Sequence, residues 1–265
     1  MCIMEDMISD RQGLLLASII ENFVKTAEPV SSKLLEKSGF FGLSSATIRA
    51  EMNDLEDSGF LAHIYTSSGR VPTDRAYRYY VDNVVPESGI WNLESGDTKF
   101  KNKNRGTNDK NQNRIKNAIT GAGEDPREIN KAVAQVLSEL SENLVITGIE
   151  EGQDFFKVGL SSLFEMPEFR EFDRAFRLTS FFDEFEDFFD KIEKEFFADD
   201  IKVFIGRENP VPNIRDETVI LAKYNLPNDL TGSLTLIGPT RMDYAKNIGL
   251  IKYATGELNK LSKEV

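Results

Sequence analysis

One stretch, residues 44–80, constrains the fold more than any other part of the chain, because two helix patterns enclose a short hairpin pattern there. The first helix pattern follows serines that can cap it, and Gly59 can end it in a left-handed turn. Its apolar residues recur at helical spacing, at Ile48, Met52 and Leu55. We therefore expect an amphipathic helix with one buried face and one polar face.

The polar face of this helix carries small polar groups and one guanidinium close to the positive end of the helix. These residues are Ser44, Ser45, Thr47, Arg49 and Asn53. Such groups suit phosphates and base edges in a major groove. An ordinary solvent-exposed helix face has a similar composition, so this pattern alone leaves both interpretations open.

The residues that follow favour DNA binding. Residues 60–65 can form a strand, residues 66–70 have turn composition, and residues 71–74 close the turn and open a second helix. A helix, a hairpin with a basic tip and another helix are typical of a winged helix-turn-helix. In that fold the helix enters the major groove, while the hairpin reaches a phosphate or the minor groove.

Further candidate DNA contacts lie on the hairpin and the second helix. The hairpin tip is expected to hold Ser67, Ser68 and Arg70. Arg75 and Arg78 lie about one turn apart on the second helix, where both can touch the DNA backbone. The tyrosines around them are expected to pack in the core instead.

The residues before this stretch supply the other helices of such a domain. Ser9 and Gln12 form a capping-box pattern ahead of an apolar helix that runs to Thr26. Ser31 can cap a short helix over residues 32–38. Residues 1–85 therefore predict a complete DNA-binding domain.

The run SSATIRAEMNDLEDSGFLAHIYTSSGRVPTDRAYRYYVD also resembles the DNA-binding domain of the HrcA heat-inducible transcription repressors. The resemblance implies a repressor of chaperone genes that binds an inverted-repeat DNA operator. It also implies a dependence on the chaperonin GroEL. The residues alone lead only to a winged-helix DNA-binding protein.

The composition excludes several other kinds of functional site. Cys2 is the only cysteine and His63 the only histidine, which excludes an internal disulfide, a histidine metal cluster and a Ser-His catalytic pair within one chain. No phosphate loop or nucleophile-base pair is present, so we expect no enzyme activity, no cofactor and no metal. The chain has no segment apolar enough to span a membrane and no basic start typical of a signal peptide, so we expect a cytoplasmic protein.

The net charge of -12 argues against a nucleic-acid partner at first sight, and residues 1–85 are themselves acidic. Their arginines, however, gather on the elements expected to face DNA, and only charges near the duplex act strongly at physiological salt. We therefore expect modest affinity for one half-site and a homodimer that binds two.

The second half of the chain predicts an α+β domain. Residues 86–117 are basic, polar and typical of a flexible linker. Residues 118–265 then contain five short strand patterns among helix patterns, with phenylalanine-rich helices at residues 167–176 and 184–197. Thr240 is a candidate cap for the last helix.

Three runs in this half also resemble HrcA, namely LSELSENLVITGI, LFEMPEFREF and GPTRMDYAK. The resemblance implies a GAF-like carboxy-terminal domain. Family members carry an inserted dimerisation domain within it, but only residues 150–154 separate LVITGI from FFKVGL here. The chain is therefore identified as a shortened member whose dimer geometry and operator spacing are open.

The leading hypothesis is thus a homodimeric, heat-responsive repressor. An alternative is a winged-helix regulator of other genes whose GAF-like domain binds a small effector, for which a partly polar cavity beside the sheet is the expected sign.

Overall fold

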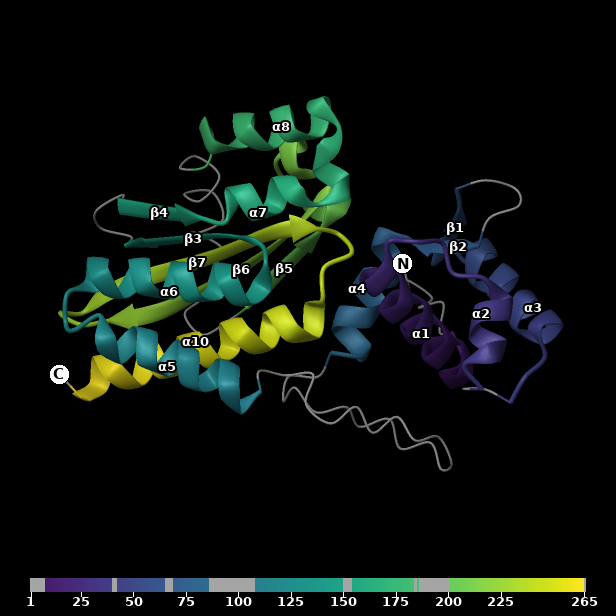
Figure 1. Ribbon diagram of the computed structural model, residues 1–265, viewed down its shortest axis with the longest axis horizontal. Coiled ribbons are helices and arrows are strands. Elements are labelled where there is room, and N and C mark those ends of the chain that lie inside the picture. The colour runs from purple at the N-terminus through teal and green to yellow at the C-terminus, as the bar shows by residue number, and fades with distance from the viewer. Residues whose placement is uncertain are drawn as a thin grey trace, which may run out of the picture. The chain divides into compact units, whose positions relative to one another are not determined.

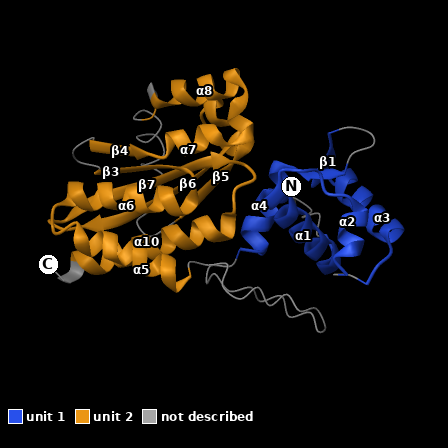
Figure 2. Cartoon of the chain, viewed as in Figure 1, with its two compact units in different colours: residues 1–103 blue, residues 104–265 orange. Residues whose placement is uncertain are grey.

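The computed structural model describes residues 8–39, 42–64, 69–85, 108–149, 154–183, 185 and 201–264. The chain divides into two compact units, residues 1–103 and 104–265 (Figure 2). Within the described residues, no helix is both long and apolar enough to cross a membrane.

Unit 1 contains four helices and a two-stranded antiparallel sheet within its described residues (Figure 1). In chain order they are α1 (Asp10–Thr26), α2 (Ser32–Lys37), α3 (Ser45–Asp57), β1 (Leu61–His63), β2 (Arg70–Pro72) and α4 (Asp74–Asn83). The expected capping box of Ser9 and Gln12 starts α1, and Ser31 caps α2. Gly59, with a φ of 76°, follows the end of α3 as expected.

The core of unit 1 forms where α1, α3 and α4 bring their apolar faces together. Ile48, Met52 and Leu55 of α3 are buried, which confirms the apolar face expected from their spacing. Tyr77 and Tyr80 of α4 are buried with them, as expected for core tyrosines. The orientation of α3 is therefore set by its apolar spacing, with its other face turned outward.

The base of the hairpin is tied to the start of α2. Val30 and Arg70 exchange two backbone hydrogen bonds of 2.9 Å, and His63 pairs with Arg70 across the two strands. A Cβ atom on Gly69 would lie 2.4 Å from the carbonyl oxygen of Val30, so only glycine permits this close approach.

Unit 2 is built around a five-stranded antiparallel sheet with the strand order β4-β3-β7-β6-β5. The strands are β3 (Leu144–Ile149), β4 (Asp154–Val158), β5 (Lys202–Ile205), β6 (Glu217–Leu226) and β7 (Leu230–Pro239). The helices are α5 (Asp109–Gly121), α6 (Pro126–Ser141), α7 (Leu160–Glu165), α8 (Phe172–Asp183) and α10 (Tyr244–Glu264), with short 3-10 helices η1 (Pro167–Arg170), η2 (Gly206–Glu208) and η3 (Pro212–Ile214). All five expected strands are therefore present, in a mixed α and β fold.

Helices cover both faces of this sheet, with α5, α6 and α10 on one side and α7 and α8 on the other (Figure 1). Leu144 and Ile146 of β3 pack in a core with Phe181 of α8. Thr147 points the other way and donates a hydrogen bond of 3.0 Å to the carbonyl of Asn130 in α6. The alternation along β3 thus matches a strand buried on both faces.

Several expected boundaries were wrong. The linker predicted over residues 86–117 overlaps α5, which begins at Asp109, while residues 86–107 lie outside the described part. The helix expected at residues 167–176 is η1 followed by α8, and the helix expected at residues 184–197 falls almost entirely outside the described residues. Asp243, not Thr240, caps α10, because its carboxylate accepts from the backbone N–H of Lys246 at 3.1 Å.

Candidate nucleic-acid interface

Two serines at the amino-terminal end of α3 make different contacts: Ser44 caps the helix, and Ser45 contacts α2. The Ser44 hydroxyl caps the helix and accepts a hydrogen bond of 3.3 Å from the backbone N–H of Thr47. Ser45 is half-buried, with its hydroxyl 2.9 Å from that of Ser32 and its backbone N–H donating to Glu36 at 2.9 Å. Ser45 therefore joins α3 to α2, whereas Ser44 stays exposed at the helix end.

The outward face of α3 presents Thr47, Arg49 and Asn53, all of them exposed. Within the described residues, the guanidinium of Arg49 forms no hydrogen bond or ion pair. Glu51 on the inward side is 8% exposed and pairs with Arg11 of α1. The helix thus directs its cation outward and its nearest carboxylate inward.

Arg70 does not lie at the hairpin tip, where we had expected it. It lies in β2 at the base of the hairpin, and its side chain is only 12% exposed. Its Nη2 donates to Asn53 Oδ1 at 2.6 Å, its Nε lies 2.7 Å from Glu56 Oε2, and its Nη1 contacts His63 Nε2. The expected tip residues Ser67 and Ser68 lie outside the described residues.

The two arginines of α4 lie near the other end of α3. Arg75 donates from Nη1 to the carbonyl of Ser58 at 2.8 Å and lies 4.6 Å from the centre of the Phe60 ring. Arg78 pairs with Asp82 one turn later at 3.0 Å. Both therefore have partners within the chain, although Arg75 remains exposed.

The structure thus joins Asn53 and Arg70 directly, with Arg49 one turn before Asn53 on α3 and Thr47 exposed near the start of the helix. Our sequence reasoning missed Glu56 and His63, which complete the surroundings of Arg70. Glu56 follows Asn53 by three residues, so both lie on one side of the helix, and that spacing is the signal from which a partner of Arg70 could have been expected. Lys33 and Lys37 of α2 are further exposed cations.

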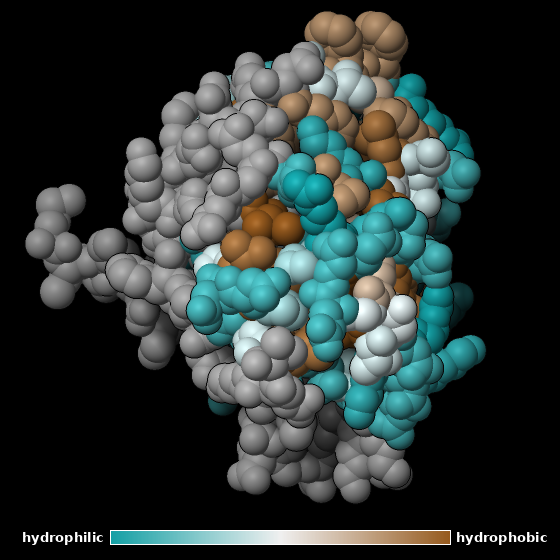
Figure 3. All heavy atoms as spheres, turned by 90° about the vertical axis from the view of Figure 1, so that its left-hand side faces the viewer, coloured by the Kyte–Doolittle hydropathy of each residue, from teal (hydrophilic) through white to brown (hydrophobic). Residues whose placement is uncertain are grey.

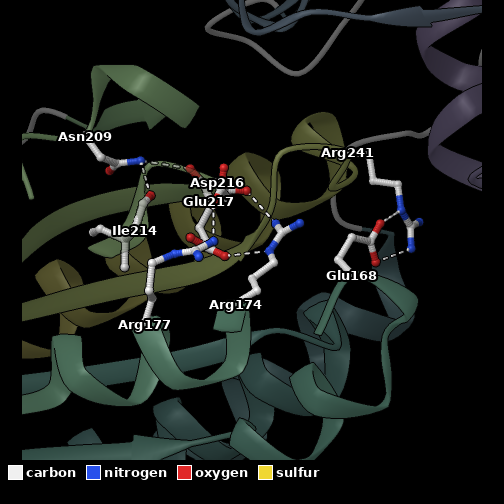
Figure 4. Close-up of polar contacts among 8 residues, drawn as sticks. All are labelled: Glu168, Arg174, Arg177, Asn209, Ile214, Asp216, Glu217 and Arg241. Atoms are coloured by element: carbon white, nitrogen blue, oxygen red, sulfur yellow. Dashed lines mark hydrogen bonds and ion pairs between the residues drawn. The ribbon is translucent and has the colours of Figure 1, made fainter. Parts of the chain in front are cut away.

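In unit 2 two groups of charged residues link separate elements: arginines of α8 reach Asp216 and Glu217 at the start of β6, and Arg241 reaches Glu168 of η1 (Figure 4). Arg174 donates from Nε to Glu217 at 2.9 Å and from Nη2 to the carbonyl of Asp216 at 2.5 Å. Burial raises the pKa of Glu217 even though Arg174 opposes the rise. For Glu168, burial also acts to raise the pKa, but the hydrogen bond and charge of Arg241 outweigh it, so that this pKa is lowered. These pairs join α8 to β6 and η1 to the segment between β7 and α10.

Unit 2 offers two further surface features. A groove of about 600 Å³ lies between α5 and α6, lined by residues of these helices and the turn between them, such as Ala118 and Gln135. It is not the cavity beside the sheet that an effector site would need. On α8, Phe172 and Phe176 are 78% and 59% exposed and stack with ring centres 6.0 Å apart. Apolar side chains also gather in the upper part of unit 2 as seen in Figure 3, and hydrophilic ones predominate below.

No group of three or more His, Cys, Asp and Glu among the described residues is placed to hold a metal ion. The exposed face of α3 with its supporting contacts is therefore the best-organised candidate site.

Comparison with known proteins decides the family. The family model described as "HrcA protein C terminal domain" matches residues 46–248. The chain belongs to the HrcA family. The expected family membership is thus confirmed, and the match begins within α3 and extends into α10.

Relatives align with nearly the whole of this chain. "Heat-inducible transcription repressor HrcA" of Brevibacillus brevis is 26% identical over 336 aligned positions, which cover 96% of this chain and 98% of that protein. The protein of the same name from Oceanobacillus iheyensis is 28% identical over 331 positions, covering 95% of this chain and 96% of that protein. Because this chain has 265 residues, these relatives contain many positions that have no counterpart in it.

A solved structure shares the fold. "Crystal structure of a hypothetical protein at 2.2 A resolution" matches with a TM-score of 0.76 and 17% identity, covering 97% of this chain and 99% of that one.

Proposed function

We propose that this HrcA-family chain is a DNA-binding repressor of heat-shock genes and that unit 1 is a winged helix-turn-helix domain. The observation that carries the proposal is the outward face of α3, where Arg49 has no partner among the described residues, Asn53 follows it one turn later, and Thr47 is also exposed. The names of the relatives, which call them heat-inducible transcription repressors, support the same function.

In this proposal α3 is the recognition helix. An α-helix with its side chains fits the major groove, and residues in its amino-terminal half reach the base edges. Arg49 lies in that half, where the helix dipole adds to the attraction for phosphate. Ser44 and Thr47 would contact the backbone or bases beside it, and Ser45 would hold α3 against α2.

The second helix and the hairpin would flank this contact. Arg75 and Arg78 of α4 would meet phosphates by exchanging or sharing their present partners. Ser67 and Ser68, which lie outside the described residues, stay candidates for further phosphate contacts. Phosphate contacts of this kind set position and add affinity without reading sequence.

Unit 2 would hold two copies together on an inverted-repeat operator. We propose that it is a GAF-like domain and that the exposed pair Phe172 and Phe176 contributes to a homodimer, because exposed apolar groups mark protein contacts. Heat induction would follow if unit 2 is only marginally stable. A decrease of about 1–2 kcal/mol in its free energy of unfolding on heating would change the unfolded population several-fold. A chaperonin such as GroEL would then restore the active fold.

DNA selection from a pool of duplexes with randomised half-sites tests the proposal. The wild-type protein should enrich one inverted repeat. Arg49→Ala should then reduce discrimination at one base position by about 1–3 kcal/mol, or about 5- to 150-fold. Arg127→Ala on α6 is a matched control, because this arginine is 66% exposed and pairs only with Asp154 among the described residues.

The same selection can contradict the proposal. If the wild-type protein enriches no sequence, it is not an operator-binding protein of this kind. If Arg49→Ala weakens every duplex equally, Arg49 contacts the backbone and does not read a base.

A further inference from the structure

The side chain of Arg70 is held on three sides, and one of its partners lies on the proposed DNA-reading face. Asn53 Oδ1, Glu56 Oε2 and His63 Nε2 each face a different nitrogen of its guanidinium. Its backbone is fixed by pairing with His63 and by the two hydrogen bonds to Val30. With 12% of its side chain exposed, Arg70 has little freedom to extend to a phosphate.

This arrangement determines which end of the Asn53 amide faces outward. An arginine side chain only donates hydrogen bonds, so the atom 2.6 Å from its Nη2 must be the amide oxygen. The orientation of the amide therefore follows from chemistry and requires no choice between two equivalent atoms. In the described part of the chain, the Nδ2 group of Asn53 has no partner, so both of its N–H groups are available.

The contacts of His63 and Glu56 strengthen this orientation. His63 Nε2 can face a guanidinium only as an acceptor, so the ring carries its proton on Nδ1 and donates it to Glu56 Oε1. Glu56 thus receives one hydrogen bond from His63 and pairs with Arg70 through its other oxygen. The cluster thus contacts all three guanidinium nitrogens of Arg70 without using the Asn53 nitrogen, although the contact of Nε with Glu56 is an ion pair and not an aligned hydrogen bond.

We infer that Arg70 is a positioning residue and that it makes Asn53 a reader of base acceptors. The inference rests on the proposed DNA-binding function and deepens it. An asparagine that pairs with adenine through two hydrogen bonds must present its oxygen and its nitrogen together to the N6 and N7 atoms of the base. With its oxygen turned to Arg70, Asn53 offers only N–H groups. Guanine suits them best, because its N7 and O6 are both acceptors in the major groove.

The first test changes the outward group and keeps the contact with Arg70. In Asn53→Asp, one carboxylate oxygen still pairs with Arg70, and the other replaces the outward N–H groups with an acceptor. We expect the preference at one base position to move from guanine to cytosine, whose N4 group donates, by about 5- to 150-fold. The sequence enriched by wild-type protein from the randomised pool is first fixed. For each position of this sequence, four duplexes that carry the four different base pairs there are then titrated with the wild-type protein and with Asn53→Asp.

The second test removes the positioning group. Arg70→Ala frees the Asn53 amide to rotate, so the same position should lose its discrimination between guanine and adenine while other positions keep theirs. The slope of log affinity against log salt should stay unchanged, because no phosphate contact is lost. A phosphate contact would instead give uniform weakening and a slope smaller by about 0.9. Arg49→Ala is the matched control, since it should alter a different position.

The possible results distinguish a failure of this inference from a failure of the proposed DNA-binding function. If wild-type protein enriches no DNA, both are overturned. If wild-type protein enriches an operator but Asn53→Asp leaves the preference at every position unchanged, the inference is overturned and the proposed function stands. Circular dichroism checks the fold of each variant, and Asn53→Asp alone decides the matter if Arg70→Ala unfolds unit 1.

Discussion

The ion pair between Arg174 and Glu217 gives the sharpest test of how unit 2 is held together. Glu217 is 1% exposed at the start of β6, and Arg174 reaches it from α8 with 16% of its own side chain exposed. Arg174→Ala leaves this carboxylate buried and without its cation (Figure 4). Removing one partner of a buried pair costs about 3–5 kcal/mol, so we expect a loss of this size near pH 8.

The loss should depend on pH. Burial already raises the pKa of Glu217, and Arg174 is the main group that opposes the rise, so Arg174→Ala raises this pKa further. A carboxyl group whose pKa is higher in the folded state binds its proton more tightly there. Its contribution to stability is present below the unfolded pKa and is lost as pH rises through the folded pKa. The destabilisation by Arg174→Ala should therefore be smaller near pH 5 than near pH 8.

Urea unfolding of the full chain at both pH values measures the loss, and hydrogen exchange of the β6 amides assigns it to unit 2. Arg177→Ala is the matched control, because Arg177 and Asp216 are 40% and 54% exposed and such pairs contribute about 0–1 kcal/mol. A loss below about 1 kcal/mol near pH 8, or an equal loss at both pH values, would refute the reasoning.

Two further predictions concern other contacts. In Arg241→Ala, Glu168 loses the group that lowers its pKa, and since a lowered pKa stabilises the fold above the unfolded pKa, the variant should lose about 1.5–3 kcal/mol near pH 7 and less near pH 3. Urea unfolding at both values measures this, and equal losses would contradict it. Gly69→Ala should destabilise unit 1 by about 1–3 kcal/mol and weaken DNA binding, because its Cβ would lie 2.4 Å from the Val30 carbonyl oxygen. Gly121→Ala, with nothing within 4 Å of its Cβ, is the control, and equal melting temperatures for the two variants would count against the prediction.

The helices of unit 1 could be predicted because their signals are local. Ser9 and Gln12 cap α1 through each other, Ser44 caps α3, and Gly59 takes the left-handed conformation just past its end. Each feature depends on residues within one helical turn, so the sequence pattern and the structure agree.

The place of Arg70 could not be predicted from local pattern. The run around Gly69 has turn composition, which led us to expect a tip arginine. The hairpin instead begins to pair at Arg70, because Val30, 40 residues earlier, binds its backbone and α3 supplies its side-chain partners. Such contacts depend on the packing of three separate elements.

The start of α5 was missed for a related reason. Only Ile115 and Ile119 are buried in this helix, and two apolar residues in a polar run are a weak helix signal. They become decisive when α6 and α10 cover them. Tertiary packing supplies most helix stability, so a nearly polar helix can form wherever such a partner exists.

The net charge of -12 is a weaker argument against DNA binding once the contacts of the acidic residues are known. Glu51 is paired with Arg11 and turned inward, and Glu56 is neutralised by Arg70, so neither opposes DNA as a free charge. Asp54 and Asp57 remain exposed in the carboxy-terminal half of α3, the half that also holds Asn53, and they lie one to two turns beyond Arg49. Glu36 lies at the amino-terminal end of α3, where its carboxylate accepts from the backbone N–H of Ser45. Because salt screens charges beyond about 8 Å, a duplex that meets α3 would be affected mainly by the charges on and beside this helix, among which Arg49 has no partner in the described residues. The acidic surface would then weaken binding to other DNA and leave discrimination to Arg49 and Asn53.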